Sequence, residues 1–282
     1  MKRDLIALSI VLALTARGVM AQSGAGQSPA LPRETPLGTQ RPKPDPPTEK
    51  KPDPVSKENP KEVIDRAVNV HGGRQNLNSI RDSVSEGRLT FYAGKSAKNT
   101  IDVTVIRKGT SRIQRVLRQR DGELRQGADG DASWESFDGM TVLAPGGLAG
   151  NYIESQTVRA VESLFDAESK GLLVRDAGKR ENARVLEVEV PAVGKPPRQT
   201  RYFIDETVPE VTRIEFITGE AKDILGKAVP ATESYAFSDY RVVQGVRTPF
   251  HIERYVNGLK IEETQLTSVR YNASVSDDVF KP

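Results

Sequence analysis

The chain has 282 residues, no cysteine and a formal net charge of +3. Without cysteine, the protein has no disulfide framework, no thiol for lipid attachment and no cysteine-ligated zinc or iron–sulfur site. The positive charge lies in the first 58 residues, because residues 59–282 hold 32 basic and 32 acidic side chains. A nucleic-acid-binding domain carries its basic excess on the folded part, so we expect no nucleic-acid partner.

Residues 1–21 have the pattern of a secretory signal peptide. Lys2 and Arg3 precede an apolar run at residues 5–14, and Val19-Met20-Ala21 suits a cleavage site. The run is too short to span a bilayer, which needs about 20 apolar residues, and no later run reaches that length. We expect an exported, periplasmic protein that is cleaved near Ala21 and does not span the membrane. The alternative is a buried N-terminal helix.

Residues 22–58 are predicted to be a proline-rich, disordered linker. Ten of the 18 prolines lie between residues 29 and 60. Runs such as PKPDPP lack the apolar side chains that would offset the entropy lost on folding. We expect an extended, solvated spacer, and a tether that docks a partner is the alternative. The folded domain is then predicted to cover residues 59–282.

The folded domain should begin with a helix. Asn59 can cap it, Pro60 suits its first position, and Glu62 completes a capping box. Gly72 and Gly73 then end the helix. An apolar stripe at helical spacing is formed by Val63, Ile64, Ala67 and Val70. A short helical turn at residues 75–80 and an amphipathic helix at residues 153–165 are also predicted.

Alternating apolar and polar residues predict about eleven strands in the rest of the domain. Tight-turn pairs separate several of them, and Asn257-Gly258 is the strongest, because a type I′ turn needs positive φ at both central residues. No βαβ alternation occurs, which favours an antiparallel sheet. The predicted strands lie at residues 86–93, 101–105, 112–118, 132–137, 140–143, 171–175, 185–190, 200–204, 211–217 and within 234–272.

These elements predict a mainly β (α+β) fold. We expect a single curved antiparallel sheet that forms an unclosed half-barrel, with helices covering its concave face. Such a sheet encloses an apolar cavity if the helices do not fill it, whereas tighter packing of the same residues gives an ordinary core. The residues predicted to line the cavity are Leu89, Phe91, Val103, Val105, Trp134, Leu186, Val188, Ile214 and Phe216.

Candidate catalytic residues are few. His71 and His251 are the only histidines, and no GxSxG elbow accompanies them. His71 comes at the end of a predicted helix, where we interpret it as a partner of the helix dipole. His251 alternates with Phe250 and Ile252, which places it at the surface. We therefore predict that the protein is not an enzyme.

Two charged clusters receive structural interpretations. Asp129, Asp131 and Glu135 resemble a calcium loop, but the glycine that such a loop requires is replaced by Trp134. A hairpin turn explains this segment better, so no metal or cofactor is predicted. A run of basic side chains is interpreted as the solvated face of a strand pair. It consists of Arg112, Arg115, Arg118 and Arg120.

Several segments, taken in order, resemble a known family. They are HGG at residues 71–73, Leu77 with Ile80, the G-x-L-x-F strand at 87–91, and FSDYRVVQGVRTPFHIERYVNG at 237–258. Over most of residues 59–280 the chain resembles the LolA/LolB-like superfamily of periplasmic outer-membrane lipoprotein-sorting proteins. The resemblance implies an unclosed antiparallel barrel with helices as a lid over a hydrophobic cavity. It also implies binding of the acyl chains of a lipid or lipoprotein, without catalysis.

We therefore expect a periplasmic, carrier-like protein that binds lipid or lipoprotein in a cavity between sheet and helices. The first alternative is a non-catalytic sensor or scaffold that binds an envelope protein through the same fold. The second is a hydrolase with a cleft around His71.

Overall fold

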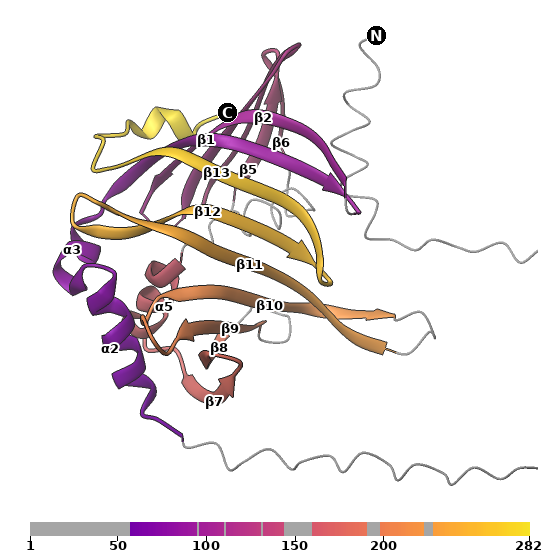
Figure 1. The fold of residues 1–282 in the computed structure, drawn as a ribbon. Coiled ribbons are helices and arrows are strands. Elements are labelled where there is room, and N and C mark those ends of the chain that lie inside the picture. Colours follow the sequence, from indigo (N-terminus) through magenta and orange to yellow (C-terminus); the bar gives the residue numbers. More distant parts are fainter. Residues whose placement is uncertain are drawn as a thin grey trace, which may run out of the picture. The chain divides into compact units, whose positions relative to one another are not determined.

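Thirteen antiparallel strands form one sheet in the described part of the chain (Figure 1). The computed structural model describes residues 57–94, 96–109, 111–130, 132–143, 160–190, 198–222 and 228–282. All of them belong to a folded unit that spans residues 54–282. The predicted signal peptide and nearly all of the predicted linker lie outside the described residues.

The strands follow one another mostly through short hairpin turns. The first six, β1 to β6, are Asp82–Ala93, Ser96–Lys108, Arg112–Gln119, Gly122–Asp129, Ala132–Phe137 and Met140–Leu143. The other seven, β7 to β13, are Val174–Arg180, Ala183–Val190, Arg198–Asp205, Val211–Lys222, Ala228–Val243, Val246–Val256 and Leu259–Tyr271. A short 3₁₀ helix, η1 (Asp277–Phe280), follows β13.

The strand order places the two ends of the strand sequence side by side. The order across the sheet is β6-β5-β4-β3-β2-β1-β13-β12-β11-β10-β9-β8-β7. The central pair therefore joins β1 to β13, with Ser83 opposite Tyr271 and Leu89 opposite Thr264. The outermost strands, β6 and β7, do not pair with each other, so the sheet is curved but not closed. This confirms the predicted fold class.

The predicted tight turn between β12 and β13 is confirmed. Asn257 has φ 48° and Gly258 has φ 77°, which are the positive values that a type I′ turn requires. The same geometry joins β5 to β6, where Asp138 has φ 48° and Gly139 has φ 79°. Because turn geometry fixes the register of a hairpin, these pairs decide which side chains share a face.

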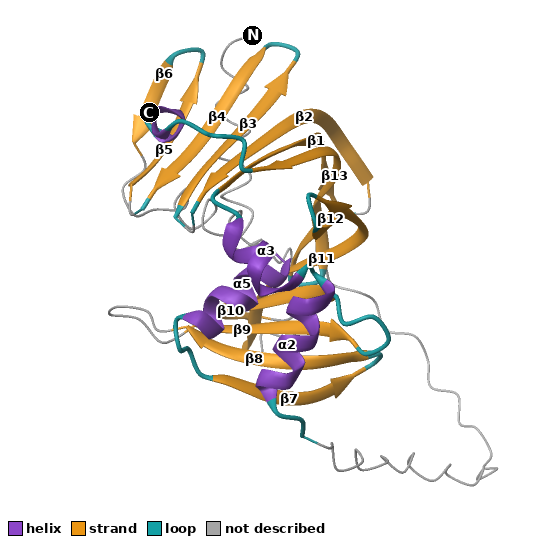
Figure 2. Cartoon of the chain, turned by 90° about the vertical axis from the view of Figure 1, so that its left-hand side faces the viewer, coloured by secondary structure: helices purple, strands orange, loops and turns teal. Residues whose placement is uncertain are grey.

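Three described helices lie against the concave face of the sheet (Figure 2): α2 (Pro60–Val70), α3 (Gly73–Ser79) and α5 (Ala160–Ser169). The Asn59 side chain accepts a hydrogen bond from the Lys61 backbone N–H at 3.1 Å, as the capping pattern predicted. The buried stripe of α2 includes Val68. Val70, which the sequence pattern places in the stripe, is only half-buried. The first part of the helix predicted at residues 153–165 lies outside the described residues. None of the helices in the described ranges is long and apolar enough to cross a membrane.

The larger apolar cluster, here called the helix-covered core, joins these helices to β7–β13. Its helix side includes Ile64, Val161 and Leu164, each at most 1% exposed. Its sheet side includes Ile214 and Phe237. At about 25 cal/mol per Å² of buried apolar surface, such a cluster is the main favourable term that fixes the helices on the sheet.

The junction of α2 and α3 is fixed by a close backbone approach to the turn between β11 and β12. The Arg247 backbone N–H donates to the His71 carbonyl at 3.1 Å. The Asn76 side-chain amide donates to the carbonyls of Gly72 at 2.9 Å and of Gly245 at 3.3 Å. Gly72 has φ 113°, and a Cβ there would lie 2.2 Å from the Gly245 carbonyl oxygen. Only glycine fits this position.

We predict that Gly72→Ala will destabilise the protein by more than about 2 kcal/mol, because it combines an unfavourable φ with a backbone clash. Gly73→Ala is the matched control, since Gly73 has φ 81° but no atom within 4 Å of the added Cβ. It should cost only about 1 kcal/mol. Urea unfolding of both variants measures the difference. Equal losses would show that the contact with Gly245 does not hold the helices in place.

Candidate functional site

The nine residues predicted to line a cavity lie in three places. Four belong to the helix-covered core: Leu186, Val188, Ile214 and Phe216. Four belong to a second apolar cluster: Leu89, Val103, Phe91 and Val105. The ninth, Trp134, belongs to neither cluster. The structure therefore does not bring all nine residues together.

The second cluster, here called the β1–β4 cluster, lies on the concave face beyond the helix-covered core. In register, Val103 lies opposite Gly87, which lies opposite Leu266 of the core, so these positions share one face. All of its members come from strands, and none comes from a described helix. Its buried members are Leu89, Ile101, Val103 and Leu117, and its half-buried members are Phe91, Val105 and Leu124.

Trp134 lies on the outer face of the sheet. It pairs with Gly127, which pairs with Gln114, so these three share the face opposite to Leu117. The Trp134 indole N–H donates to the Phe280 carbonyl at 2.9 Å, and the Gln114 amide donates to the Val279 carbonyl at 2.7 Å. The C-terminal segment thus covers the outer face of β3–β5, and Trp134 anchors it.

A cavity of about 400 Å³ lies beside this C-terminal segment. Trp134 and Val116 form part of its apolar wall, and Arg118, Arg125 and Lys281 line its polar part. Because these side chains belong to the outer face and the C-terminal segment, this is not the cavity predicted on the concave face.

A buried ionic network, here called the ionic band, crosses the concave face. Arg115 of β3 and Glu262 of β13 are both 4% exposed, and their Nη2 and Oε2 atoms are 3.7 Å apart. β2 and β1 lie between these strands in the sheet, so the two side chains meet across the concavity. The interpretation of Arg115 as part of a solvated face is therefore wrong, although Arg118 is 52% exposed as expected.

The ionic band continues over β12 and β11. Arg254 lies 3.6 Å from Glu262, and its Nε donates to Glu233 at 2.7 Å. The Tyr235 hydroxyl also donates to Glu233 at 2.7 Å. Tyr235 belongs to the helix-covered core, while Phe91 of the β1–β4 cluster lies opposite Glu262. Along this row of the sheet the ionic band lies between the two apolar clusters, which adjoin elsewhere through Leu266, Gly87 and Val103. Burial lowers the pKa of Arg115.

The His71 side chain is held between backbone groups of β12 and β10. Its side chain is fully buried, with Nδ1 2.9 Å from the Arg247 carbonyl oxygen and Nε2 accepting from the Val211 N–H at 3.5 Å. The Tyr240 ring packs edge-on against it at 5.2 Å. These contacts fit a neutral imidazole with its proton on Nδ1, and burial lowers its pKa. Within the described ranges, both ring nitrogens face backbone groups and no serine hydroxyl.

Comparisons with known proteins identify the fold. No family model matches the sequence, and no curated protein matches it. Three solved structures share 9–16% identity with the chain and have TM-scores of 0.52–0.54. Each alignment covers 79–80% of this chain and 97–98% of the solved structure's chain.

One of these structures is a domain described as an outer membrane lipoprotein-sorting protein from Vibrio parahaemolyticus. The second is a LolA superfamily protein from Nitrosomonas europaea, and the third is a DUF1329 family protein from Desulfovibrio piger. At these identities the likeness concerns the fold alone. The family resemblance seen in the sequence is thus confirmed as a LolA-like fold.

We predict that Glu262→Gln will destabilise the protein by roughly 3 kcal/mol, because it leaves Arg115 and Arg254 buried beside a neutral side chain. Glu187→Gln is the control, since Glu187 bonds Arg201 in a more exposed pair and should cost less than about 1 kcal/mol. Urea unfolding of each variant measures both values. A loss at Glu262 no larger than at Glu187 would contradict the assignment of a buried ionic band.

We predict that His71 makes the protein less stable as the pH falls below 6.5. The buried imidazole has a lowered pKa, so the unfolded chain takes up the proton first. The contribution of neutral His71 to the free energy of unfolding is fully present above about pH 6.5. It is lost progressively as the pH falls from that value to the lowered pKa. Tyr240, Glu162, Glu210 and Arg247 surround the ring, and the two carboxylates act in the opposite direction.

Unfolding free energies measured between pH 7.5 and pH 5.5 test this. His71→Gln should be less stable at pH 7.5 but lose less stability on acidification than the wild type. His251→Gln is the control, because the steep decline should persist in it. An unchanged pH profile in His71→Gln would contradict the prediction.

Proposed function

We propose that this protein is a carrier-like protein of the cell envelope that binds the acyl chains of a lipid or lipoprotein. The observation that supports this most strongly is the β1–β4 cluster. It extends the apolar part of the concave face beyond the strands against which α2, α3 and α5 pack. Its half-buried members Phe91, Val105 and Leu124 can still gain burial from an apolar ligand, and an acyl chain has the right chemistry.

The chemistry of the face suits an amphiphile. Each buried CH₂ contributes about 0.8 kcal/mol, so a long chain along the cluster gives useful affinity without any polar contact. Phe91, Val105 and Leu124 are half-buried and form the accessible margin of the cluster. The ionic band lies beside Phe91, at Glu262, and gives this end of the cluster a charged border.

Export to the envelope is part of the proposal. It rests on the signal-peptide pattern of residues 1–21 and on the LolA-like fold of the folded unit. The proline-rich segment at residues 22–58 would then separate the folded unit from the cleavage site. No catalytic step is proposed.

A scaffold that binds an envelope protein is a second candidate, favoured by the edge strand β6. Its apolar side chains Met140, Val142 and Leu143 are 65–67% exposed, and β6 is paired on one side only among the described strands. An exposed apolar edge is the surface to which a partner strand adds. This candidate requires no lipid, so ligand binding separates it from the first.

We predict that Phe91→Asp will abolish binding of a fluorescent fatty acid, because it places a carboxylate on the apolar margin next to Glu262. Thr90→Asp is the matched control, since it adds the same charge one residue away on the outer face and should bind normally. Fluorescence titration measures affinity, and circular dichroism checks that both variants are folded. Normal binding by folded Phe91→Asp would remove the concave face as the ligand site.

A further inference from the structure

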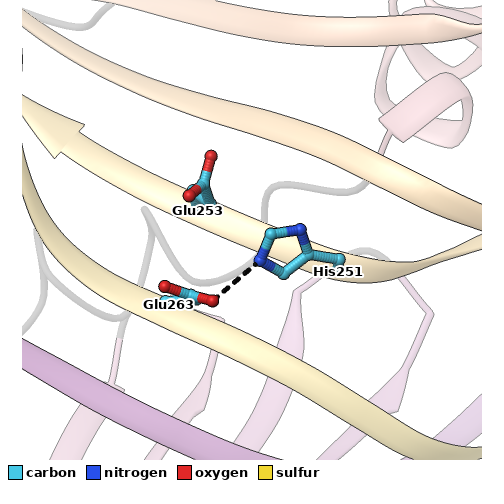
Figure 3. A group of neighbouring side chains, drawn as sticks. All are labelled: His251, Glu253 and Glu263. Atoms are coloured by element: carbon cyan, nitrogen blue, oxygen red, sulfur yellow. Dashed lines mark hydrogen bonds and ion pairs between the residues drawn. The ribbon is translucent and has the colours of Figure 1, made fainter.

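His251, Glu253 and Glu263 form a cluster on the outer face of β12 and β13 (Figure 3). Their nitrogen and oxygen ligand atoms all lie within 4.8 Å of one another. Arg254 and Glu262, the next residues in each strand, point to the concave face, so this cluster lies on the opposite side of the sheet. It is separate from the proposed ligand surface and from the ionic band.

The strand register places two like charges directly opposite each other. Glu253 pairs with Glu263 across β12 and β13, an arrangement that is unfavourable unless a cation lies between the carboxylates. Lys260 supplies that cation, because its Nζ donates to Glu253 and to Glu263 at 2.8 Å each. The position between the carboxylates is therefore already a cation position.

Another glutamate pair on the same sheet shows what is distinctive here. Arg201 donates to Glu187 at 3.0 Å and to Glu215 at 3.2 Å, again across neighbouring strands. That pair has no histidine, because the chain has only His71 and His251. Its cation is also a planar guanidinium that binds both carboxylates directionally. Lys260 is instead a compact charge on a flexible stem, which can leave its place to another cation.

The ligand atoms of the cluster are oriented by neighbouring hydroxyl groups. Ser238 Oγ lies 2.9 Å from His251 Nδ1, and Nε2 on the other side of the ring lies 3.1 Å from Glu263. The hydroxyl of Tyr255 donates to Glu253 at 2.8 Å, and that of Tyr92 donates to Glu263 at 2.6 Å. Metal ligands in proteins are held in this way by a second layer of hydrogen bonds.

The two glutamate carboxylates match the charge of a divalent ion once the Lys260 ammonium has moved away.

We propose that His251, Glu253 and Glu263 bind a divalent transition-metal ion of the Zn²⁺ class, which takes the place of the Lys260 ammonium. One imidazole nitrogen and two carboxylate oxygens are a mixed ligand set that suits Zn²⁺ and leaves a fourth position open. Mg²⁺ and Ca²⁺ take oxygen ligands and gain nothing from His251. The proposal does not depend on lipid binding.

The chain's two histidines allow a direct test. Metal-stripped protein is titrated with Zn²⁺ while the ring signals of both histidines are followed by ¹⁵N-correlated NMR. The His251 signals should shift and saturate at one equivalent, and the signals of buried His71 should not move. Mg²⁺ at the same concentrations should leave both rings unchanged.

Calorimetric titration of variants tests the ligand set. His251→Ala and Glu263→Gln should each weaken Zn²⁺ binding by at least about tenfold. Lys260→Met should strengthen it several-fold, because it removes the competing ammonium. Glu215→Gln, which disrupts the pair that has no histidine, should leave binding unchanged. Circular dichroism establishes that each variant is folded.

Three results would overturn the proposal. They are Zn²⁺ binding that leaves the His251 ring unshifted, equal competition by Mg²⁺, and weaker binding by Lys260→Met. The last would mean that Lys260 organises the carboxylates and does not occupy the metal position.

Discussion

An apolar sheet face must be removed from water, and this constraint shapes the whole folded unit. The described helices pack on the part of the sheet around β7–β13, where they form the helix-covered core. The pairing of β1 with β13 then carries the same face onward into β2–β4. There the β1–β4 cluster is built from strand residues alone, and the ionic band of Arg115, Glu262, Arg254 and Glu233 lies beside it. An apolar surface bounded by buried charges is the basis of the proposed amphiphile site.

Much of the fold could be predicted because its local signals agree with one another. Period-2 alternation fixed the strands, and Asn257-Gly258 fixed the register of the last hairpin through positive φ at both residues. The cap at Asn59 fixed the start of α2. The boundaries were harder to predict, because exposed strand ends carry no apolar pattern. The strand β4 (Gly122–Asp129) was missed because its one large apolar residue is Leu124, so it shows no alternation.

The candidate sites were harder to predict, since alternation does not say which face a residue takes when both faces carry apolar side chains. Trp134 lies on the outer face because the C-terminal segment covers it there, a contact 146 residues away in sequence. Arg115 lies in a basic run, and only its pairing with Glu262 across the concavity shows that it is buried. His251 acquires Glu263 as a neighbour only through the hairpin register. Each of these depends on long-range geometry.

The central claim is that the concave face binds acyl chains, and native mass spectrometry tests it most directly. The protein should be expressed with its own N-terminal segment and purified from the periplasm without detergent. The account predicts a species heavier than the mature chain by one acylated molecule, which an organic solvent releases intact. A spectrum that contains only the mass of the mature chain, under conditions that preserve other protein–lipid complexes, would contradict it.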